Sequence, residues 1–257
     1  MTNRDMLILL MTTLCVGDNI KPFTNTEMRK ILLLFKSKNY ELSHLYNKSN
    51  AELLDIFQLQ DNLIGHSFVE RITNLLGRQG SLAFDLVDIK EWGINIVTIF
   101  DETYPKKILN TLNEKAPYLL YYAGDLNITS KRLLGFSGSR LKANDKSIND
   151  YVKGWVDLAY SKNYGIVSGG AKGIDTYAAD AAILNEQYLV EFLSDSLFKK
   201  VHNARVSKMI REGKMLLLSE VNPYAGFNAG MAMSRNKYIY ALSEKVIVPR
   251  ASYTIKG

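Results

Sequence analysis

Tyr164-Gly-Ile-Val-Ser-Gly-Gly-Ala-Lys-Gly-Ile-Asp175 is the stretch that decides the fold of this chain. Its apolar start, residues 165–167, predicts a short buried strand. Residues 168–173 then form a glycine-rich loop, and the alanine-rich segment 174–185 predicts a helix. A strand, a glycine loop and a helix in this order aim backbone N–H groups and a helix N-terminus at a phosphate. The same pattern also occurs as a tight turn that binds no ligand.

The side chains within this loop favour an anion. Gly169, Gly170 and Gly173 permit positive φ angles and a close backbone approach that a Cβ would block. Lys172 adds a positive charge on a long side chain. Asp175 opens the predicted helix, where a carboxylate is typical of an N-terminal cap or a dipole partner rather than of a catalytic acid.

The composition is that of an ordinary globular protein. The 257 residues are 47% hydrophobic and 23% charged, which suits one large domain or two smaller ones. The formal net charge of +6 is compatible with a polyanionic partner and equally with a mildly basic surface. A single cysteine excludes an internal disulfide and fits a reducing cytoplasm.

The sequence offers no pattern for metal binding, nucleophilic catalysis or membrane insertion. The three histidines are scattered, so no cluster has metal-ligand spacing and no Ser-His-Asp or Cys-His arrangement is indicated. The most apolar N-terminal segment, 6–16, is too short to span a bilayer and lacks a signal-peptide cleavage site. We therefore expect a cytoplasmic protein that is not an enzyme, has no metal or cofactor, and does not bind a membrane.

Residues 1–88 are expected to form a small helical N-terminal domain. Thr24-Asn-Thr-Glu27 has the pattern of a capping box, and Ser49 with Asn50 predicts a second helix start. Segments 68–76 and 81–92 predict two further helices. Short helices of this kind make either a plain bundle or a DNA-binding module, and the absence of a basic run favours the bundle.

Residues 89–257 show strands that alternate with helices. Seven short apolar or β-branched runs predict strands at 94–100, 117–122, 132–137, 164–168, 188–193, 214–219 and 245–249. Longer segments between them predict helices at 147–162, 174–185, 197–212 and 229–243. This alternation predicts an α/β fold, a Rossmann-like parallel sheet flanked by helices, with right-handed crossovers.

Ligands of such sheets bind beyond the carboxyl ends of the strands. This rim is expected to collect two glycine loops, one after the strand at 132–137 and one after the strand at 164–168. The candidate residues that the two loops supply are Gly138, Ser139, Arg140, Ser168, Gly169, Gly170, Lys172 and Gly173. Two such loops with two cations favour an anion pocket over two chance turns. Arg140 is interpreted as a phosphate ligand, with a surface ion pair as the alternative.

Two further features leave alternatives open. Tyr224 and Phe227, in the loop before the last predicted helix, either stack on bases or pin that loop to the core. The predicted helix 197–212 carries a basic face that is either simply solvated or an extension of a phosphate path. Its basic residues are Lys199, Lys200, Arg205, Lys208 and Arg211.

Several motifs in fixed order resemble the DNA-processing protein A (DprA/Smf) family. They are Gly138-Ser-Arg140, Ser168-Gly-Gly-Ala-Lys-Gly-Ile-Asp175, Leu218-Ser-Glu220 and Ser234-Arg-Asn-Lys237. Tyr104-Pro105, Pro117-Tyr-Leu-Leu-Tyr121 and Gly124-Asp125 resemble the segment that leads into the Rossmann-like domain of the same family. The resemblance covers roughly residues 90–257, and the helical N-terminal part is compatible with it.

The resemblance implies a protein that binds single-stranded DNA without established catalytic activity and helps to load a RecA-type recombinase during DNA uptake in natural transformation. It implies Arg140 and Lys172 as phosphate ligands, and Asn228 and Arg235 as residues that line the far side of the pocket. It also implies a homodimer formed through the sheet domain, for which the runs 188–193 and 215–218 are expected to leave an edge or face to cover.

The chain departs from the family pattern in three places. Tyr177-Ala-Ala-Asp180 stands where the family usually has a histidine after an alanine, and 194–198 lacks a glycine and a Tyr-Pro. The sequence stops at Gly257, where the family continues into a Gly-Gly-Thr loop, so the domain is expected to be either truncated at its C-terminal end or that of a shortened member of the family. The alternative function is a Rossmann-like nucleotide sensor or a nucleotide phosphoribohydrolase, although the Pro-Gly-Gly-x-Gly-Thr loop of such hydrolases does not occur in the sequence.

Overall fold

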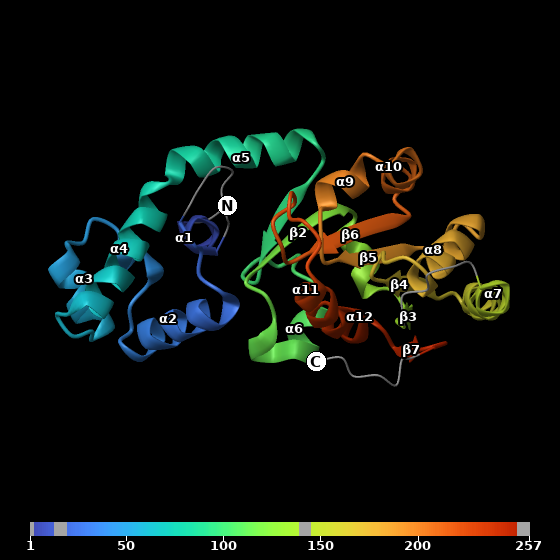
Figure 1. Ribbon diagram of the computed structural model, residues 1–257, viewed down its shortest axis with the longest axis horizontal. Helices are drawn as coiled ribbons and strands as arrows, with labels where there is room; N and C mark the ends of the chain where they lie inside the picture. Colours follow the sequence, from blue (N-terminus) through green and yellow to red (C-terminus); the bar gives the residue numbers. More distant parts are fainter. Residues whose placement is uncertain (1–2, 13–19, 139–144, 251–257) are drawn as a thin grey trace. The chain divides into compact units, whose positions relative to one another are not determined.

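The computed structural model describes residues 3–12, 20–138 and 145–250. Contacts divide the chain into two compact units (Figure 1). The first comprises Met1–Glu91, Thr98–Phe100 and Pro117–Leu119, and the second comprises Trp92–Val97, Asp101–Ala116 and Leu120–Gly257. The division into domains at residues 88 and 89 stays a prediction.

The first unit is helical. The helix starts predicted after Thr24 and Ser49 are confirmed, whereas the helices predicted at 68–76 and 81–92 begin earlier, at Leu63 and Gln79. The elements are α1 (Asn3–Thr12), α2 (Asn25–Ser37), η1 (Leu42–Leu45), α3 (Asn50–Phe57), α4 (Leu63–Gly77) and α5 (Gln79–Glu91). The capping box before α2 is confirmed, because Thr24 N donates to Glu27 Oε2 at 2.7 Å and Glu27 N donates to Thr24 Oγ1 at 3.2 Å. Ser49 and Glu52 form the same reciprocal pair before α3. No helix in the described ranges is long and apolar enough to span a membrane.

Arg71 on α4 fastens the segment that precedes α2. Its guanidinium donates to Lys21 O at 2.8 Å, to Pro22 O at 2.7 Å and to Glu27 Oε1 at 2.8 Å, and it lies 4.0 Å from the ring centroid of Phe23. Partial burial opposes the ionisation of Glu27, but the hydrogen bonds from Arg71 and Thr24 outweigh it and lower the pKa of this carboxyl to about 2. Glu52, in the capping box before α3, also has its pKa lowered to about 2, by hydrogen bonds from Lys48 and Ser49. Each of the two capping boxes of the first unit therefore holds a strongly acidic carboxylate.

Seven strands form one sheet in the order β1-β2-β6-β5-β4-β3-β7, and Figure 1 labels the strands from β2 to β7. The strands are β1 (Asn95–Thr98), β2 (Leu119–Gly124), β3 (Leu133–Phe136), β4 (Gly165–Ser168), β5 (Leu189–Leu193), β6 (Met215–Ser219) and β7 (Lys245–Ile247). The strands from β3 to β7 pair in parallel, as expected for a Rossmann-like fold. The pair β2 and β6 is antiparallel, with Tyr121 opposite Ser219, so the sheet is mostly rather than wholly parallel.

The strand order corrects one expectation. The runs 188–193 and 215–218 form β5 and β6, which lie side by side in the middle of the sheet, and every residue of both strands is buried. Neither strand offers an edge or an open face, so the structural reason for expecting a homodimer is wrong. The homodimer itself stays a prediction.

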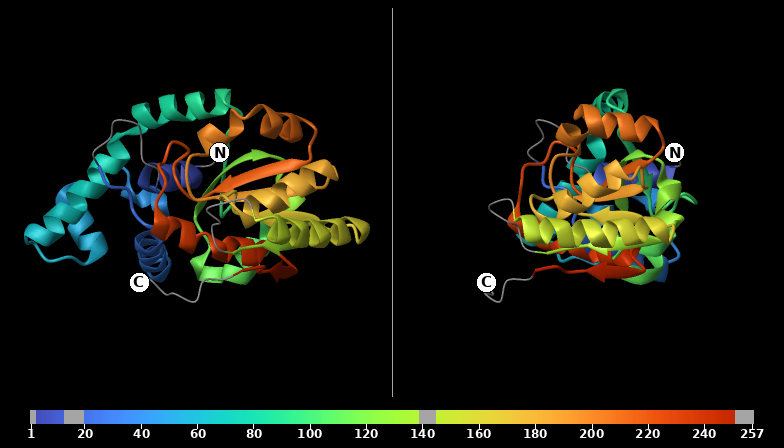
Figure 2. Two further views of the ribbon diagram at one scale, coloured as in Figure 1. Left: turned by 45° about the vertical axis from the view of Figure 1, so that its right-hand side comes forward. Right: turned by 90° about the vertical axis from the view of Figure 1, so that its right-hand side faces the viewer.

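The helices of the second unit are α6 (Lys106–Leu112), η2 (Asn113–Lys115), η3 (Leu126–Ser130), α7 (Lys146–Ser161), α8 (Ile174–Leu184), α9 (Leu197–Val201), α10 (Ala204–Arg211), α11 (Ala229–Ser234) and α12 (Asn236–Leu242). Two predicted helices are each split. Asn203 starts α10 by accepting hydrogen bonds from Arg205 N and Val206 N, and Arg235 separates α11 from α12. The helices α7 and α8 pack against each other and against β4, and both views of Figure 2 show them side by side.

A buried serine lies at the carboxyl end of each of the four adjacent parallel strands β3, β4, β5 and β6. These residues are Ser137, Ser168, Ser194 and Ser219, with exposed fractions of 6%, 0%, 7% and 0%. Their small side chains let the chain turn away from the sheet without raising a bulky residue above the strand ends. This edge carries the two glycine loops, as the sequence predicts.

Candidate anion-binding site at the glycine loop

The loop between β4 and α8 has the backbone that its glycines were expected to provide. Gly170 has φ +66° and Gly173 has φ +95°, both in the region that favours glycine. Gly169 has an ordinary φ, and its reason for being glycine is space. A Cβ built on Gly169 would lie 0.7 Å from Nη1 of Arg235. The loop therefore uses two glycines for their conformation and one for a close side-chain approach.

Asp175 ties the loop to the first turn of α8. This carboxylate is 6% exposed, and its Oδ2 accepts hydrogen bonds from Gly169 N at 3.1 Å and from Ala171 N at 3.2 Å. Burial raises the pKa of Asp175, against the lowering effects of the Arg235 charge and the two N–H donors. Asp175 lies in the first turn of α8, where a dipole partner was expected, but its hydrogen bonds go to the loop and it does not cap the helix. Two of the loop N–H groups are therefore already satisfied inside the protein.

Arg235 lies beneath the loop rather than on its surface. Its side chain comes from the junction of α11 and α12 and is 4% exposed. Nη1 donates to the backbone oxygen of Phe192 at 3.1 Å and lies 3.6 Å from Oδ2 of Asp175. The expected contact of Arg235 with DNA stays a prediction. The guanidinium is held between β5, Asp175 and Gly169. It supports the loop from below.

A second buried carboxylate adjoins this support. Glu191 on β5 is 2% exposed, and its Oε2 lies 2.7 Å from Nζ of Lys200 on α9. A Cβ on Gly170 would lie 3.2 Å from the same oxygen, so Glu191 sits directly under the loop. Two carboxylates and two cations thus alternate beneath Gly169 and Gly170. Charges held in this way fix the loop before any ligand arrives.

The groups that remain available on the loop are donors. Gly170, Lys172 and Gly173 have backbone N–H groups with no intramolecular acceptor among the described residues. Lys172 is exposed, and its ammonium has no ion-pair partner in the described part of the chain. The first turn of α8 begins directly after Gly173, which has no side-chain cap. Three N–H groups, one ammonium and the positive end of a helix dipole therefore belong to one short stretch, residues 170–174.

A cavity of about 310 Å³ opens beside this loop. The residues that line it are Ser137, Gly138, Ala171, Asp175, Phe227, Ala229, Ala232, Met233, Arg235 and Asn236. Gly138 belongs to the first glycine loop, and a Cβ there would lie 2.4 Å from Cδ1 of Ile174 and 2.9 Å from the backbone oxygen of Arg250. The structure therefore brings the two predicted loops together around one cavity.

The other predicted residues fall into different places. Ser139 and Arg140 lie outside the described residues. Ser168 is fully buried, and its hydroxyl has no hydrogen-bond partner in the described structure, so it shapes the strand end. Asn228 is exposed and caps α11 by accepting a hydrogen bond from Met231 N at 3.0 Å.

The alternatives left open for the surface residues are partly decided. Tyr224 packs against Phe198, with ring centroids 5.0 Å apart, so it helps to pin its loop. Phe227 is 54% exposed and lines the cavity. The basic face of the predicted helix 197–212 is largely paired: besides Lys200, Arg205 lies 2.7 Å from Asp180 and Lys208 lies 3.7 Å from Glu212.

Sequence reasoning missed three contributors to the site. Met233 is 77% exposed on the cavity wall, Arg250 follows β7 beside Gly138, and Glu191 lies under the loop. A charged residue in the otherwise apolar run 189–193 was the one available signal for Glu191. Nothing local in the sequence points to Met233 or Arg250, because only the strand order brings their elements to this rim.

Comparisons with known proteins agree with this architecture. The model of the family described as DNA recombination-mediator protein A matches residues 95–254. DNA processing protein DprA of Streptococcus pneumoniae is 28% identical over 231 residues, which cover 84% of this chain and 79% of that protein. The X-ray structure of DNA processing protein A from Streptococcus pneumoniae is similar with a TM-score of 0.67 and 24% identity, over 96% of this chain and 77% of that chain. A structure that addresses the single-stranded DNA binding mode of DNA processing protein A from Helicobacter pylori has a TM-score of 0.48 and 22% identity, over 64% of this chain and 71% of that one.

Proposed function

The chain belongs to the DNA recombination-mediator protein A family, and on that premise we propose that it binds single-stranded DNA by its phosphates at the glycine loop. The bound strand is then passed to a RecA-type recombinase during DNA uptake. The protein acts by holding the strand and not by cutting it.

The observation that carries this proposal is that some N–H groups of the loop bind Asp175 while others have no acceptor in the described structure. Gly169 N and Ala171 N are bound to the buried Asp175, which makes the loop rigid. The N–H groups of Gly170, Lys172 and Gly173 are left for a ligand, beside the exposed ammonium of Lys172. Donors that are fixed in advance bind an anion without an ordering cost, and three N–H groups around one cation suit the oxygens of a phosphate.

The cavity favours a nucleic acid strand over a small inorganic anion. Phe227 and Met233 line the cavity together with Ala171 of the loop, and they are 54% and 77% exposed. An apolar wall beside a phosphate site fits a base that is attached to that phosphate, and base–aromatic stacking is worth about 1–3 kcal/mol per base. Among the described residues no group of three or more acidic, histidine or cysteine side chains is arranged to hold a metal ion.

The proposal includes three expectations from the sequence, for Arg140, for Asn228 and for the oligomeric state. Arg140 supplies a further phosphate contact from the first glycine loop. Asn228 sets the wall of the cavity through the start of α11. Two copies of the chain form a homodimer, which would place two such sites on one strand.

A binding experiment tests the proposal. A labelled oligonucleotide is titrated with protein at several salt concentrations, with mononucleotide as competitor, for the wild type, Lys172→Gln and the matched control Lys162→Gln. Lys162 is exposed and follows α7 at the opposite edge of the sheet. Removal of the Lys172 charge should weaken binding equally for all base sequences and flatten the log–log salt slope by about 0.7, the value for one phosphate on a single strand.

Two results would contradict the proposal. If Lys172→Gln binds with the affinity and slope of the control, the loop does not hold phosphates. If mononucleotide competes as well as an oligonucleotide of equal phosphate concentration, the site is that of a free-nucleotide protein.

A further inference from the structure

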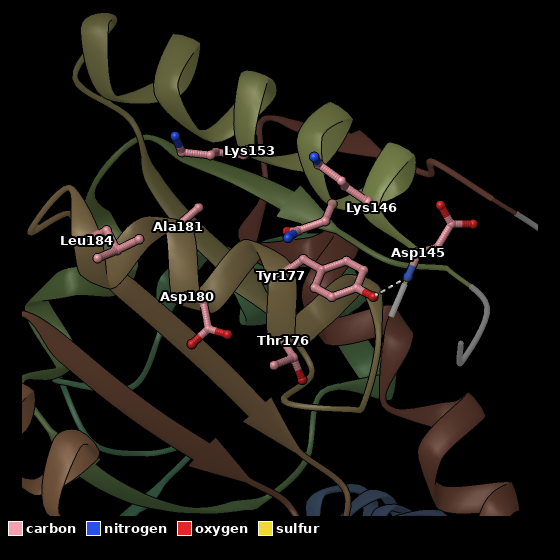
Figure 3. Close-up of a pocket in the computed structure, with 9 residues that line it drawn as sticks. Asp145, Lys146, Lys153, Thr176, Tyr177, Asp180, Ala181 and Leu184 are labelled. Carbon is pink, nitrogen blue, oxygen red and sulfur yellow. Dashed lines mark hydrogen bonds between the residues drawn. The ribbon is translucent and has the colours of Figure 1, made fainter. Parts of the chain in front are cut away.

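A second cavity, of about 400 Å³, lies on the other side of the α8 N-terminus, between α7 and α8 (Figure 3). Asp175 lines the cavity at the glycine loop, and the next two residues of α8, Thr176 and Tyr177, line this groove. Thr176 Oγ1 donates to Ala171 O of the glycine loop at 2.9 Å. The first turn of α8 is therefore the wall between the two cavities. An extended ligand bound at the glycine loop would reach the groove by crossing this one helical turn.

One wall of the groove is a stripe of donors on α7. Lys146, Asn149 and Lys153 are spaced at i, i+3 and i+7, which places them on one helix face, and Figure 3 shows both lysines over the groove. Both lysines are exposed and have no ion-pair partner among the described residues. Their Cα atoms are about 10 Å apart along the helix, seven residues at about 1.5 Å each.

The carboxylates of the groove are already neutralised. Asp180 lies 2.7 Å from Nη1 of Arg205, and Asp145 lies 3.9 Å from Nη1 of Arg250 while it also caps α7 through Ile148 N. They therefore offer little competition for the two lysines. An anion in the groove meets unpaired positive charge and no unpaired carboxylate.

The Tyr177 hydroxyl and the N-termini of α7 and α8 add further hydrogen-bond donors and positive charge at one end of the groove. The Tyr177 oxygen accepts a hydrogen bond from Asp145 N at 3.0 Å, and its own O–H has no acceptor among the described residues. The helices α7 and α8 are both crossovers between adjacent parallel strands, so they run in the same direction. Their N-termini, at Lys146 and Ile174, thus lie at the same end of the groove and add two positive dipole ends there.

We propose that this groove binds the phosphates of the DNA strand that follow those held at the glycine loop, with Lys146 and Lys153 as the two phosphate contacts. The inference rests on the proposed function and extends its site along α7. The strand crosses the first turn of α8, where the Tyr177 hydroxyl donates to a phosphate oxygen. The groove therefore serves long strands and not short ones.

The test compares two double variants with the wild type. Lys146→Gln/Lys153→Gln removes the groove charges, and Lys131→Gln/Lys162→Gln removes two exposed lysines at the edge where the parallel strands begin. Each protein is titrated against oligothymidylates of about 4 to about 16 nucleotides, the range of site sizes in single-strand-binding folds. Circular dichroism verifies that each variant is folded.

We expect the groove variant to bind the shortest strands like the control and to lose affinity only above a threshold length. On long strands its log–log salt slope should be flatter by about 1.4, two phosphates at about 0.7 each, so the wild type should lose about sevenfold more affinity than the variant between about 50 and about 200 mM salt. If the groove variant and the control bind long strands with equal affinity and equal salt slope, the proposal that the groove binds phosphates is wrong. The proposed site at the glycine loop is not affected by this result. Equal losses at every length would also overturn the proposal for the groove, because the lysines would then not act on a separate stretch of strand. A wild type that binds no oligonucleotide would remove the proposed function and the groove with it.

Discussion

Gly169→Ala is the sharpest test of how the glycine loop is built. A Cβ at this position would lie 0.7 Å from Nη1, 1.7 Å from Cζ and 2.2 Å from Nη2 of Arg235. Ordinary contact begins at 3.4 Å, so the guanidinium would have to retreat by about 2.7 Å. The backbone gives no other reason for a penalty, because the φ of Gly169 lies outside the left-handed region.

The retreat is expensive because of what holds Arg235. A movement of this size breaks the 3.1 Å hydrogen bond to Phe192 O and separates the charge from Asp175, 3.6 Å away. A hydrogen bond to a charged group contributes about 1.5–3 kcal/mol, and the loss of a partner from a buried ion pair costs about 3–5 kcal/mol. We expect Gly169→Ala to lower the free energy of unfolding by about 3 kcal/mol, measured by urea denaturation.

A double-mutant cycle isolates the cause. Arg235→Ala alone should also destabilise the protein, since it leaves Asp175 buried without its cation. In the Arg235→Ala background the added Cβ at Gly169 no longer meets the guanidinium, so Gly169→Ala should cost less there than in the wild type, by about 0.5–3 kcal/mol, the range of interaction energies between residues in contact. Gly154→Ala, on an exposed face of α7 with nothing within 4 Å of the new Cβ, is the matched control. A cost for Gly169→Ala that is the same with and without Arg235 would refute the reasoning.

Four further outcomes are expected. Glu27→Gln should remove a stabilisation that is present above pH 4.5 and lost as the pH falls towards about 2, because the pKa of Glu27 is lowered in the folded protein. Since 36% of this side chain is exposed, the loss in the free energy of unfolding amounts to about 1 kcal/mol. An unchanged dependence of the free energy of unfolding on pH below 4.5 would contradict this. Gly170→Ala should cost about 1–2 kcal/mol in urea denaturation, because φ is +66° and Leu193 Cδ2 would lie 2.8 Å from the Cβ; a neutral change would show that the loop relaxes. Arg140→Ala should weaken oligonucleotide binding uniformly across sequences and flatten the salt slope by about 0.7, and a slope equal to that of wild type would remove Arg140 from the site. A chelator should leave oligonucleotide binding unchanged in an anisotropy titration, whereas a loss restored by one divalent metal would show a metal site.

Local signals in the sequence predicted the parts of the fold that depend on local forces. The capping boxes at Thr24 and Ser49 involve residues three apart, so the sequence contains both partners of each hydrogen bond. The strand, loop and helix from 164 to 185 are set in the same way by an apolar run, glycines and alanines. The strand order was not predictable at this level, because it depends on pairing between segments far apart in the chain. That is why β5 and β6 were expected to leave an edge and instead lie in the centre of the sheet.

The candidate site shows the same division between local and distant causes. Asp175 and the loop N–H groups that it binds are four to six residues apart, so the sequence shows both partners within one segment. The sequence also predicts that Asp175 lies at the start of a helix. Arg235 lies sixty positions after Asp175, in a motif whose basic residues look alike in the sequence. Only the packing of the α11–α12 junction against β5 shows that this arginine points inward.

Burial separates the two roles that a positive charge takes at this loop. Arg235, 4% exposed, has its charge opposed by Asp175 within the protein and cannot also meet a phosphate without leaving a buried carboxylate unpaired. Lys172 is exposed and unpaired in the described structure, so meeting a phosphate leaves no carboxylate behind. On the proposed function, we therefore expect Arg235 to affect affinity by holding the N–H donors in place and Lys172 to affect it directly. It follows that loss of Arg235 should impair binding through stability and loop order, with a salt slope close to that of wild type, whereas loss of Lys172 should change the slope and leave stability intact.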